Sequence, residues 1–392
     1  MILRNSARRA DDLLRIGLFW PTSRTQIPCG YVAQQNPDVL DVEWQRRMAR
    51  ETESVGFDFV LLADSYSPNS AASSQIGHLD PSTHSIPWSW LVLGETTTLG
   101  VIATMHTTFI PPADIASFGA QLDSMSNGRF GWNITTGYRE SEPALFGGDG
   151  LADHDERYDM AEECIEVVLD LWTADAPTVH HGRYRRCEGF LEGPPPVQRP
   201  GPILVNAGAS DRGMHTAARY CDYVFTSVPD YAQVPRLTAK LAKFAHESGR
   251  DASPEVLVLV TTLLRDASGE ARAEMRRVNE ATAAESEAAL AFYRRFAEGS
   301  ESFAKSAARA GDNSKVTDPT KVTRAVYSPP LLGRPTDVAE EVITIYREHD
   351  VRGFLFSMPY FWWDDLAKYA ELFDELHRAG VWRPARERES LW

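Results

Sequence analysis

Residues 128–147 read GRFGWNITTGYRESEPALFG, and the first half of this stretch shows the alternation of a strand. From Arg129 to Thr135 the side chains alternate, so that Asn133 lies on the opposite face from the apolar Trp132. An amide among apolar neighbours requires a hydrogen-bond partner. We therefore predict a parallel strand of an α/β fold, with its apolar face under helices and its polar face at the mouth of a barrel.

Strand-like apolar runs and amphipathic helical runs alternate on both sides of this stretch, as they do when crossover helices cover parallel strands. Eight strands are predicted, at Leu14–Phe19, Phe57–Ala63, Leu99–Met105, Arg129–Thr135, Ile203–Ala207, Tyr223–Ser227, Val256–Leu263 and Gly353–Ser357. Helices are predicted at Val39–Val55, Asp114–Met125, Glu156–Trp172, Asp211–Tyr220 and Pro335–His349. Eight such units close a (β/α)8 TIM barrel. The alternative is a doubly wound open sheet, which the strand count and the missing Gly-x-Gly-x-x-Gly turn disfavour.

We predict one domain over residues 1–392, because no internal repeat or low-complexity linker interrupts the pattern. Three segments are longer than ordinary connections, and they follow the second, fourth and seventh strands. They are residues 66–85, 137–200 and 270–326. Loops after barrel strands form the functional face, so these insertions are expected to form the walls and lid of a pocket.

The chain carries a formal charge of −15, which argues against nucleic acid or an anionic membrane surface as a partner. No apolar run is long enough to span a bilayer and no signal core follows the N-terminal charges, so we expect a cytoplasmic location. The four cysteines are scattered without metal-ligand spacing, so neither a metal site nor a disulfide framework is expected. A small molecule is the expected partner.

Polar side chains stand at the ends of two further predicted strands. Thr104 and His106 share one face where the third strand ends, and active-site groups of a barrel lie at that end. His106 is a candidate acid or base, although a lone histidine is more often a structural residue. Asp64 ends the second strand, where its carboxylate requires solvent or hydrogen-bond donors.

A candidate phosphate site follows the fifth strand, where the sequence reads NAGASDRG. Gly208, Ala209 and Ser210 precede a predicted helix, whose first backbone N–H groups can cradle an anion together with the serine hydroxyl. An ordinary capped helix start is the alternative. In the run HDERYDM, Arg157 is a second candidate for a phosphate contact, and a surface ion pair is its alternative.

Together these segments resemble the luciferase-like flavin monooxygenases, and the similarity in order and spacing covers residues 14–265 and 331–380. The segments that carry it are NGRFGWNITTG, HDERY, RYDMAEECIEVVLDLW, NAGASDRG and LLGRPTDVAEEV. Within the superfamily the chain is most similar to the branch that holds the pyrimidine oxygenase and the nitrilotriacetate, dimethylsulfone and dibenzothiophene-sulfone monooxygenases. Each segment is a weak signal alone, whereas their shared order is a strong one.

The resemblance implies an FMN site at the barrel mouth. Ser210 and the turn before it would hold the phosphate, while Thr104 and Asn133 would flank the isoalloxazine. The candidate catalytic residues are Thr104, Asn133 and His106. The cofactor-binding residues implied are Asp64, Thr104, Asn133, Glu142, His154, Arg157, Tyr158, Gly208, Ala209 and Ser210.

The resemblance also implies a two-component enzyme. Reduced FMN, supplied by a separate NAD(P)H:flavin reductase, would react with O2, and a flavin peroxide would oxygenate a small organic substrate. A homodimer or homotetramer is implied as well. A deazaflavin (F420)-dependent oxidoreductase and a non-catalytic flavin-binding protein are the alternatives. Tyr138 and the loop around Trp88 and Trp90 are candidates for the substrate side, or else they pack against the barrel.

Three departures from the relatives bear on the substrate. The pyrimidine oxygenase has a lysine where this chain has Asp64 and Ser65, so its substrate is in doubt here. The stretches HSIPWSW and VLVTTLL lack the cysteine and the Arg-x-His pair of the alkanesulfonate monooxygenases. Residues 270–326 have no clear match, and a substrate lid is expected there.

Overall fold

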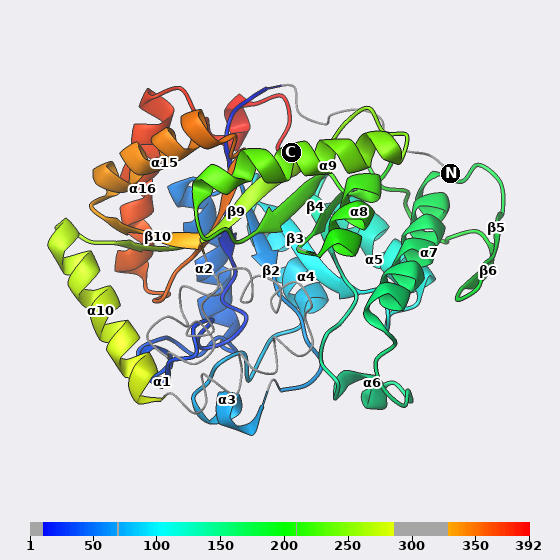
Figure 1. The fold of residues 1–392 in the computed structure, drawn as a ribbon, viewed down its shortest axis with the longest axis horizontal. Coiled ribbons are helices and arrows are strands. Elements are labelled where there is room, and N and C mark those ends of the chain that lie inside the picture. The colour runs from blue at the N-terminus through cyan, green and yellow to red at the C-terminus, as the bar shows by residue number, and fades with distance from the viewer. Residues whose placement is uncertain (1–10, 69, 209, 286–327) are drawn as a thin grey trace.

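The computed structural model describes residues 11–68, 70–208, 210–285 and 328–392, and a barrel of parallel strands lies at its centre (Figure 1). The barrel strands are β1 (Arg15–Phe19), β2 (Phe59–Leu62), β3 (Gly100–His106), β4 (Phe130–Thr135), β7 (Ile203–Asn206), β8 (Tyr223–Thr226), β9 (Glu255–Leu264) and β11 (Gly353–Ser357). They pair in this order, and β11 pairs with both β9 and β1, which closes the barrel. The predicted (β/α)8 fold and all its strands are confirmed.

Helices cover the outside of the barrel (Figure 1). They are α2 (Val42–Val55), α4 (Ser85–Glu95), α5 (Pro112–Met125), α7 (His154–Thr173), α8 (Asp211–Tyr220), α9 (Val234–Glu247), α15 (Pro335–His349) and α16 (Trp363–Arg378). The ends of α2 show why they form where they do. The Asp41 carboxylate accepts hydrogen bonds from the first backbone N–H groups, and Gly56 ends the helix with a left-handed φ of 116°. All five predicted helices are present.

Alternating side chains of the strands form two apolar layers. Trp132 faces outward into the large core between barrel and helices, as predicted. Ile102 and Ile203 face inward and fill the barrel. Gly131 makes room for this inner layer, because a Cβ there would lie 2.6 Å from Cγ1 of Ile203. Asn133, two residues further along β4, shares this inward face at the C-terminal end of the strand.

The segment 381–392 closes the floor of the barrel, at the N-terminal ends of the strands. The centroid of the Trp392 ring lies 6.1 Å from that of Phe59, and its Nε1 donates to the carbonyl of Gly128 at 2.9 Å. Gly100 leaves the space for this ring, since a Cβ there would come within 2.6 Å of it. The last residues of the chain described are therefore part of the barrel core.

A buried ion pair holds this floor segment in place. Nη2 of Arg388 donates to Oδ1 of Asp58 at 2.7 Å, and the two side chains are 0% and 1% exposed. Oδ2 of Asp58 accepts from the backbone N–H of Ile16 at 2.7 Å and from Nε1 of Trp382 at 3.0 Å. Burial raises the pKa of Asp58 and the guanidinium opposes that rise, so the charged carboxylate depends on these donors.

Three strands lie outside the predicted eight. β10 (Ser328–Gly333) pairs in parallel with the end of β9, at the outer edge of the sheet. It contains Pro329 and Pro330, which have no backbone N–H to donate to a neighbouring strand. A strand of this kind can therefore lie only at the edge of a sheet. β5 (Thr178–His181) and β6 (Arg186–Gly189) form an antiparallel hairpin that projects beside α7 (Figure 1).

The predicted insertions carry further helices and a hairpin around the barrel (Figure 1). Residues 66–85 contain α3 (Ala71–Gln75), and residues 137–200 contain α6 (Glu142–Leu145) as well as α7 and the hairpin. Residues 270–326 begin within α10 (Ser268–Ala284), next to α1 (Gly30–Ala33). The lid expected further along lies outside the described residues, which leave out 286–327.

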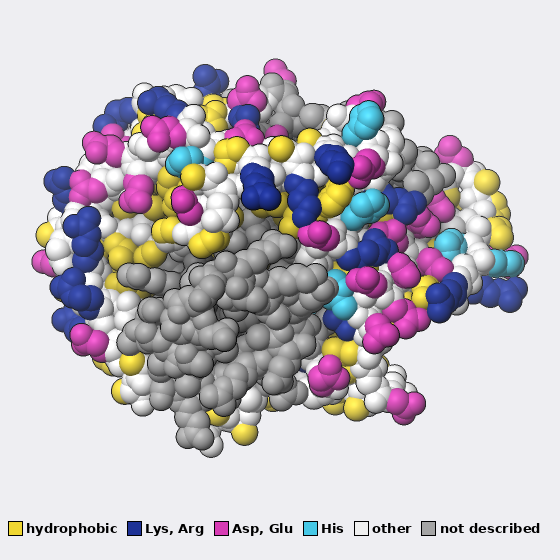
Figure 2. Space-filling model, in the orientation of Figure 1, with side chains coloured by type: hydrophobic (Ala, Val, Ile, Leu, Met, Phe, Trp, Pro, Cys, Tyr) yellow, Lys and Arg dark blue, Asp and Glu magenta, His cyan; other side chains and the backbone are white. Residues whose placement is uncertain are grey.

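Within the part of the chain that the structure describes, no helix combines the length and the apolar character needed to cross a membrane. Among the side chains that are coloured in Figure 2, acidic and basic ones are interspersed. The four cysteines are free thiols.

We expect the fold to lose stability in mild acid because of His78. This residue is fully buried beside the backbone of Gln26, and burial lowers its pKa to about 3, with Arg139 acting in the same direction. In the unfolded chain the pKa is about 6.5, so the unfolded state takes up the proton first as pH falls. The free energy of unfolding should then decrease by about 1.4 kcal/mol per pH unit below about pH 6.5.

Urea unfolding at about pH 7 and about pH 5 measures this effect. The variant His78→Gln takes up no proton there, so its decrease between the two pH values should be smaller than that of the wild type by about 2 kcal/mol. An equal decrease in both proteins would show that His78 is not the responsible group.

Candidate active site

Thr104 and Asn133 face each other at the ends of neighbouring strands. Nδ2 of Asn133 donates to Oγ1 of Thr104 at 2.9 Å, and the register of β3 and β4 pairs the two residues directly. Both are buried. Oδ1 of Asn133 is buried and has no hydrogen-bond partner within the described residues. A buried amide oxygen of this kind needs a donor, so this end of β4 is suited to a polar group of a ligand.

His106 continues the same face of β3. Its Nε2 lies 3.4 Å from the carbonyl oxygen of Asp64, while Nδ1 is buried without a partner among the residues that the structure describes. Burial lowers the pKa of His106, against the opposing influence of Glu142 and Asp64. The ring is therefore neutral near pH 7 and offers one nitrogen to a ligand. Its catalytic role stays a prediction.

The carboxylate of Asp64 is hydrogen-bonded to residues at the start of helix α4. Its Oδ1 lies 2.8 Å from Nδ1 of His84, and its Oδ2 accepts from the backbone N–H and the hydroxyl of Ser85 at 3.1 and 2.9 Å. The hydrogen bond to Asp64 raises the pKa of His84. The carboxylate thus finds its donors within the protein, and contact between Asp64 and a cofactor stays a prediction.

Glu142 connects the loop after β4 to the loop after β2. Its Oε1 accepts from the backbone N–H of Tyr66 at 2.9 Å, and the side chain is 1% exposed. Arg139, in the same loop, donates to the carbonyl of Ser67. These bonds hold the two loops together as one wall of the mouth, and the predicted contact of Glu142 with a cofactor is not tested by them.

An aromatic cluster that the sequence analysis did not identify lies beside His106. The centroid of the Tyr66 ring is 5.2 Å from that of His106 and 4.8 Å from that of Phe146. Phe109 stacks on Phe146 at 4.7 Å. A signal was available, because the loops after β2, β3 and β4 each carry one of these three aromatic residues.

The aromatic residues that the sequence suggested for the substrate side are Trp88, Trp90 and Tyr138, and they differ in exposure. Trp88 packs against the outer core and Trp90 is 39% exposed, both on α4. Trp88 therefore fits the alternative interpretation, in which these aromatic residues pack against the barrel. Tyr138 is half-buried, with Cζ of Arg139 at 5.6 Å from the centre of its ring.

The candidate phosphate site brings Tyr158 and Ser210 together. The Ser210 hydroxyl caps α8 by accepting from the N–H of Gly213 at 3.0 Å, and it also hydrogen-bonds Tyr158. A Cβ on Gly208 or on Gly213 would come within 2.6 or 2.5 Å of the Tyr158 hydroxyl, so side chains are excluded on both sides of it. Ala209, the remaining residue predicted for this turn, lies outside the described residues.

Arg157 and His154 open helix α7 next to this site. Nη1 of Arg157 donates to the carbonyl of Ala152 at 2.6 Å, whereas Nε is buried and has no partner in the described part of the chain. Burial lowers the pKa of Arg157, so an added anion would stabilise its charge. The alternative of a surface ion pair is wrong, because the side chain is buried. The His154 ring packs against Tyr158 with centroids 5.2 Å apart.

Ion pairs between α7 and α8 fix the position of Tyr158 relative to Ser210. Arg212 of α8 lies 2.7 Å from Asp159 and also contacts Glu162, both of α7. Arg219 lies 2.9 Å from Glu162. These pairs join the two helices along one side, so the phosphate site does not depend on the turn alone.

The groups described converge on one part of the rim because β3, β4 and β7 are neighbours in the barrel. Thr104 and Asn133 end β3 and β4, and the turn with Gly208 and Ser210 follows β7. Within the described residues, no group of histidine, cysteine, aspartate or glutamate side chains is arranged to hold a metal ion. The arrangement suits an elongated ligand with a polar ring edge at one end and an anionic group at the other.

The family model described as luciferase-like monooxygenase matches residues 19–352. Nitrilotriacetate monooxygenase component A of Aminobacter aminovorans is 28% identical over 281 residues, which are 64% of this chain and 61% of that protein. FMNH(2)-dependent dimethylsulfone monooxygenase of Pseudomonas putida is 29% identical over 242 residues, 61% of this chain and 62% of that protein. In both cases the match spans less than two thirds of the relative.

Solved structures share the fold. A riboflavin lyase with modified FMN and riboflavin superposes with a TM-score of 0.85 at 23% identity, covering 97% of this chain and 94% of that one. An F420-dependent secondary alcohol dehydrogenase reaches 0.65 at 18% identity, covering 93% of this chain and 99% of that one. Identities this low establish likeness of fold alone.

Proposed function

Because the chain belongs to the luciferase-like monooxygenase family, we propose that it is the oxygenase of a two-component enzyme that uses reduced FMN and O2. Its substrate is a small organic molecule that receives one oxygen atom. Reduced FMN supplies the electrons with which O2 is activated. Nitrilotriacetate and dimethylsulfone, which two relatives' names mention, differ widely in charge, so family membership leaves the substrate open.

The observation that carries this proposal is a pair of buried polar atoms without partners in the described part of the chain. Oδ1 of Asn133 lacks a donor at the end of β4, and Nε of Arg157 lacks an acceptor at the start of α7. An N–H group at the edge of a flavin ring fits the first, and a phosphate fits the second. The hydroxyls of Tyr158 and Ser210 lie on the phosphate side.

Each of the neighbouring residues has a stated task in this proposal. Thr104 accepts from the amide NH2 of Asn133, which leaves the amide oxygen for the ligand. The ring of His106 is neutral because burial lowers its pKa, and its Nδ1 can donate a hydrogen bond to the ligand or accept one from it. The rings of Tyr66 and Phe109 form an apolar wall that keeps bulk water from the reacting atoms.

The partners follow from the same proposal. The sequence has no nicotinamide-binding fingerprint, so a separate NAD(P)H:flavin reductase is proposed to supply reduced FMN. Val179 and Phe190, near the ends of the projecting hairpin, are each 64% exposed, which supports association into a homodimer or homotetramer. A cytoplasmic location is also part of this proposal, because no apolar run of the sequence is long enough to span a bilayer.

The decisive experiment supplies the purified protein with FMN, a flavin reductase, NADH and isotopically labelled O2, and follows a substrate panel by mass spectrometry. A product that carries one labelled oxygen atom, and that forms only with the reductase present, is the expected result. Bound FMN without any product across the panel would favour the flavin-binding protein. Tight binding of deazaflavin with none of FMN would favour the F420-dependent oxidoreductase.

Replacing Asn133 by leucine is expected to weaken FMN binding about tenfold, since one buried hydrogen bond to the ligand is lost. Quenching of flavin fluorescence during titration measures the dissociation constant. Thr104→Ser is the matched control, because it keeps the hydroxyl that accepts from Asn133. Unchanged FMN affinity in Asn133→Leu would rule out this residue as a flavin contact.

A further inference from the structure

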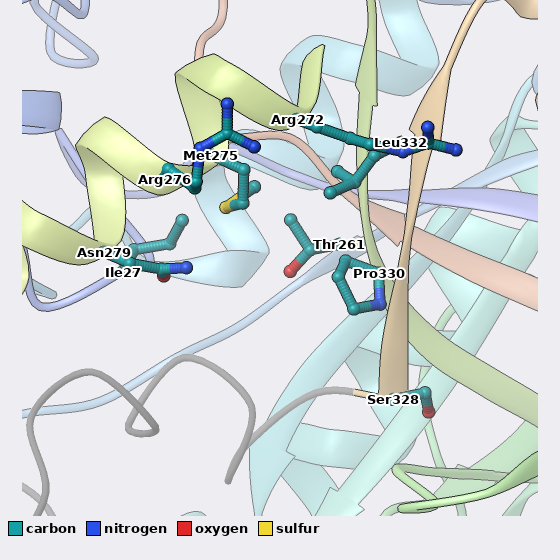
Figure 3. A pocket seen from close by; sticks show the side chains of 9 residues that line it. All are labelled: Ile27, Thr261, Arg272, Met275, Arg276, Asn279, Ser328, Pro330 and Leu332. Carbon is teal, nitrogen blue, oxygen red and sulfur yellow. The ribbon is translucent and has the colours of Figure 1, made fainter. Parts of the chain in front are cut away.

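A cavity of about 360 Å³ lies between α10 and the ends of β9 and β10 (Figure 3). Thr261, Ser328 and Asn279 bring polar groups to its lining, and Met275 and Leu332 form apolar walls. A volume of this size falls in the lower part of the range of about 300–1,000 Å³ that small-molecule sites occupy. The mixed lining suits a small molecule with an apolar body.

The cavity lies across the barrel mouth from the candidate flavin site. Thr261 is on the inward face of β9, in line with Leu257 and Leu259, which fill the barrel. In the closed order of the strands, β9 is four positions from β3 in either direction, so the two strands are opposite each other. The cavity and the residues Thr104 and Asn133 therefore lie on opposite sides of the same barrel.

One face of α10 borders the cavity. Arg272, Met275, Arg276 and Asn279 follow the spacing at which side chains share one side of a helix, and all four line the cavity. Met275 also belongs to a buried cluster with Ile27 and further apolar residues of β9 and α1, which fixes the helix in place. Figure 3 shows that both arginines start from α10 and that their guanidinium groups lie apart, with that of Arg272 beside Leu332 on β10 and that of Arg276 over the helix.

The two arginines carry charges that the described residues leave without an ion pair. Arg265, close by at the end of β9, differs in this respect, because Glu274 and Asp365 lie 2.7 and 2.5 Å from its guanidinium. No ion pair of Arg272 or Arg276 occurs in the described part of the chain. Burial raises the pKa of Glu341, and the charge of Arg272 opposes that rise without direct contact.

The two guanidinium groups give the cavity edge a local positive charge, whereas the net charge of −15 on the whole chain repels anions at long range. Guanidinium groups match the planar, two-pronged geometry of a carboxylate. We propose that this cavity binds the substrate, and that the substrate is a small organic acid whose carboxylate pairs with the guanidinium group of Arg272 or with that of Arg276. Its apolar body contacts Met275 and Leu332 and points past Thr261 toward the barrel axis. This inference rests on the proposed function, which makes the mouth an oxygenation site.

Calorimetric titration of the flavin-free protein tests the inference with two matched pairs of probes: phenylacetate with phenylacetamide, and hexanoate with hexanamide. In each pair the two molecules share one shape and differ in charge. At least one acid should bind about tenfold more tightly than its amide. The double variant Arg272→Gln/Arg276→Gln should bind acid and amide equally. Arg277→Gln, on the same helix but outside the lining, is the matched control and should keep the preference.

Flavin binding by the same preparations separates this inference from the proposed function. If FMN binds but neither acid is preferred, or if the preference survives in the double variant, the anionic substrate class is wrong and the oxygenase proposal stands. If the acid preference depends on the arginines but FMN does not bind, the cavity site stands and the oxygenase proposal falls. Both variants change exposed side chains only, so the fold is expected to persist.

Discussion

The variant Ser210→Asp is expected to bind FMN at least about a hundredfold more weakly than the wild type. The new carboxylate would lie beside the phosphate, and two like charges about 4 Å apart repel by about 4 kcal/mol at the effective dielectric of a protein surface. Aspartate caps a helix as well as serine does, so α8 should still begin at the same residue. The loss would therefore report on charge at the phosphate site and not on the helix.

Ser210→Asn is the control for this prediction, because asparagine also caps helices but carries no charge. Its FMN affinity should remain within about tenfold of the wild type, and all three proteins should unfold at similar urea concentrations. Fluorescence titration with FMN gives the affinities. If Ser210→Asp bound FMN as tightly as the wild type does, the assignment of the turn after β7 to the phosphate site would be wrong.

Arg388→Met is expected to lower the free energy of unfolding by about 3–5 kcal/mol, because it leaves the buried carboxylate of Asp58 without its counter-ion. The remaining donors, the backbone N–H of Ile16 and the indole of Trp382, carry no full charge. Urea unfolding near neutral pH measures the change. Arg386→Met, in the same segment with its side chain 78% exposed, should change the stability by less than about 0.5 kcal/mol.

The loss of stability caused by Arg388→Met should become smaller as the pH falls. Burial already raises the pKa of Asp58, and removal of the guanidinium raises it further. A carboxylate with a raised folded pKa is destabilising above that pKa and is relieved by protonation below it. The difference between variant and wild type should thus shrink from about pH 8 to about pH 5, while the effect of His78 cancels. A difference that is constant or grows in acid would contradict this account.

Most of the barrel could be predicted from the sequence because parallel strands are buried on both faces. Segments such as Phe59–Leu62 then read as short apolar runs between polar turns, and helices such as Asp211–Tyr220 carry their own start signals. β10 could not be predicted in this way. Its two prolines contradict the strand pattern, and only the neighbouring edge of β9 makes a strand possible there.

The candidate site was predictable where one strand determines the direction of a side chain. Alternation along β4 placed Asn133 inward, and the same rule placed Thr104 opposite it. The rule fails in loops. The cofactor contacts of Asp64 and Glu142 are implied by the resemblance and stay predictions, and alternation did not reveal that each accepts hydrogen bonds from a segment many residues away. Such pairings depend on how loops pack against each other, which no local pattern encodes.

The floor of the barrel has a consequence for how the chain folds during its synthesis. β1 pairs with β11, and the ring of Trp392 lies beside that of Phe59, so contacts of the first strands wait for segments that come far later in the chain. Until then the inner faces of the early strands have no partner, and such long-range closure is slow compared with helix formation. A growing chain of this kind keeps apolar surface exposed until β11 and the floor segment have been made, and such surface promotes aggregation.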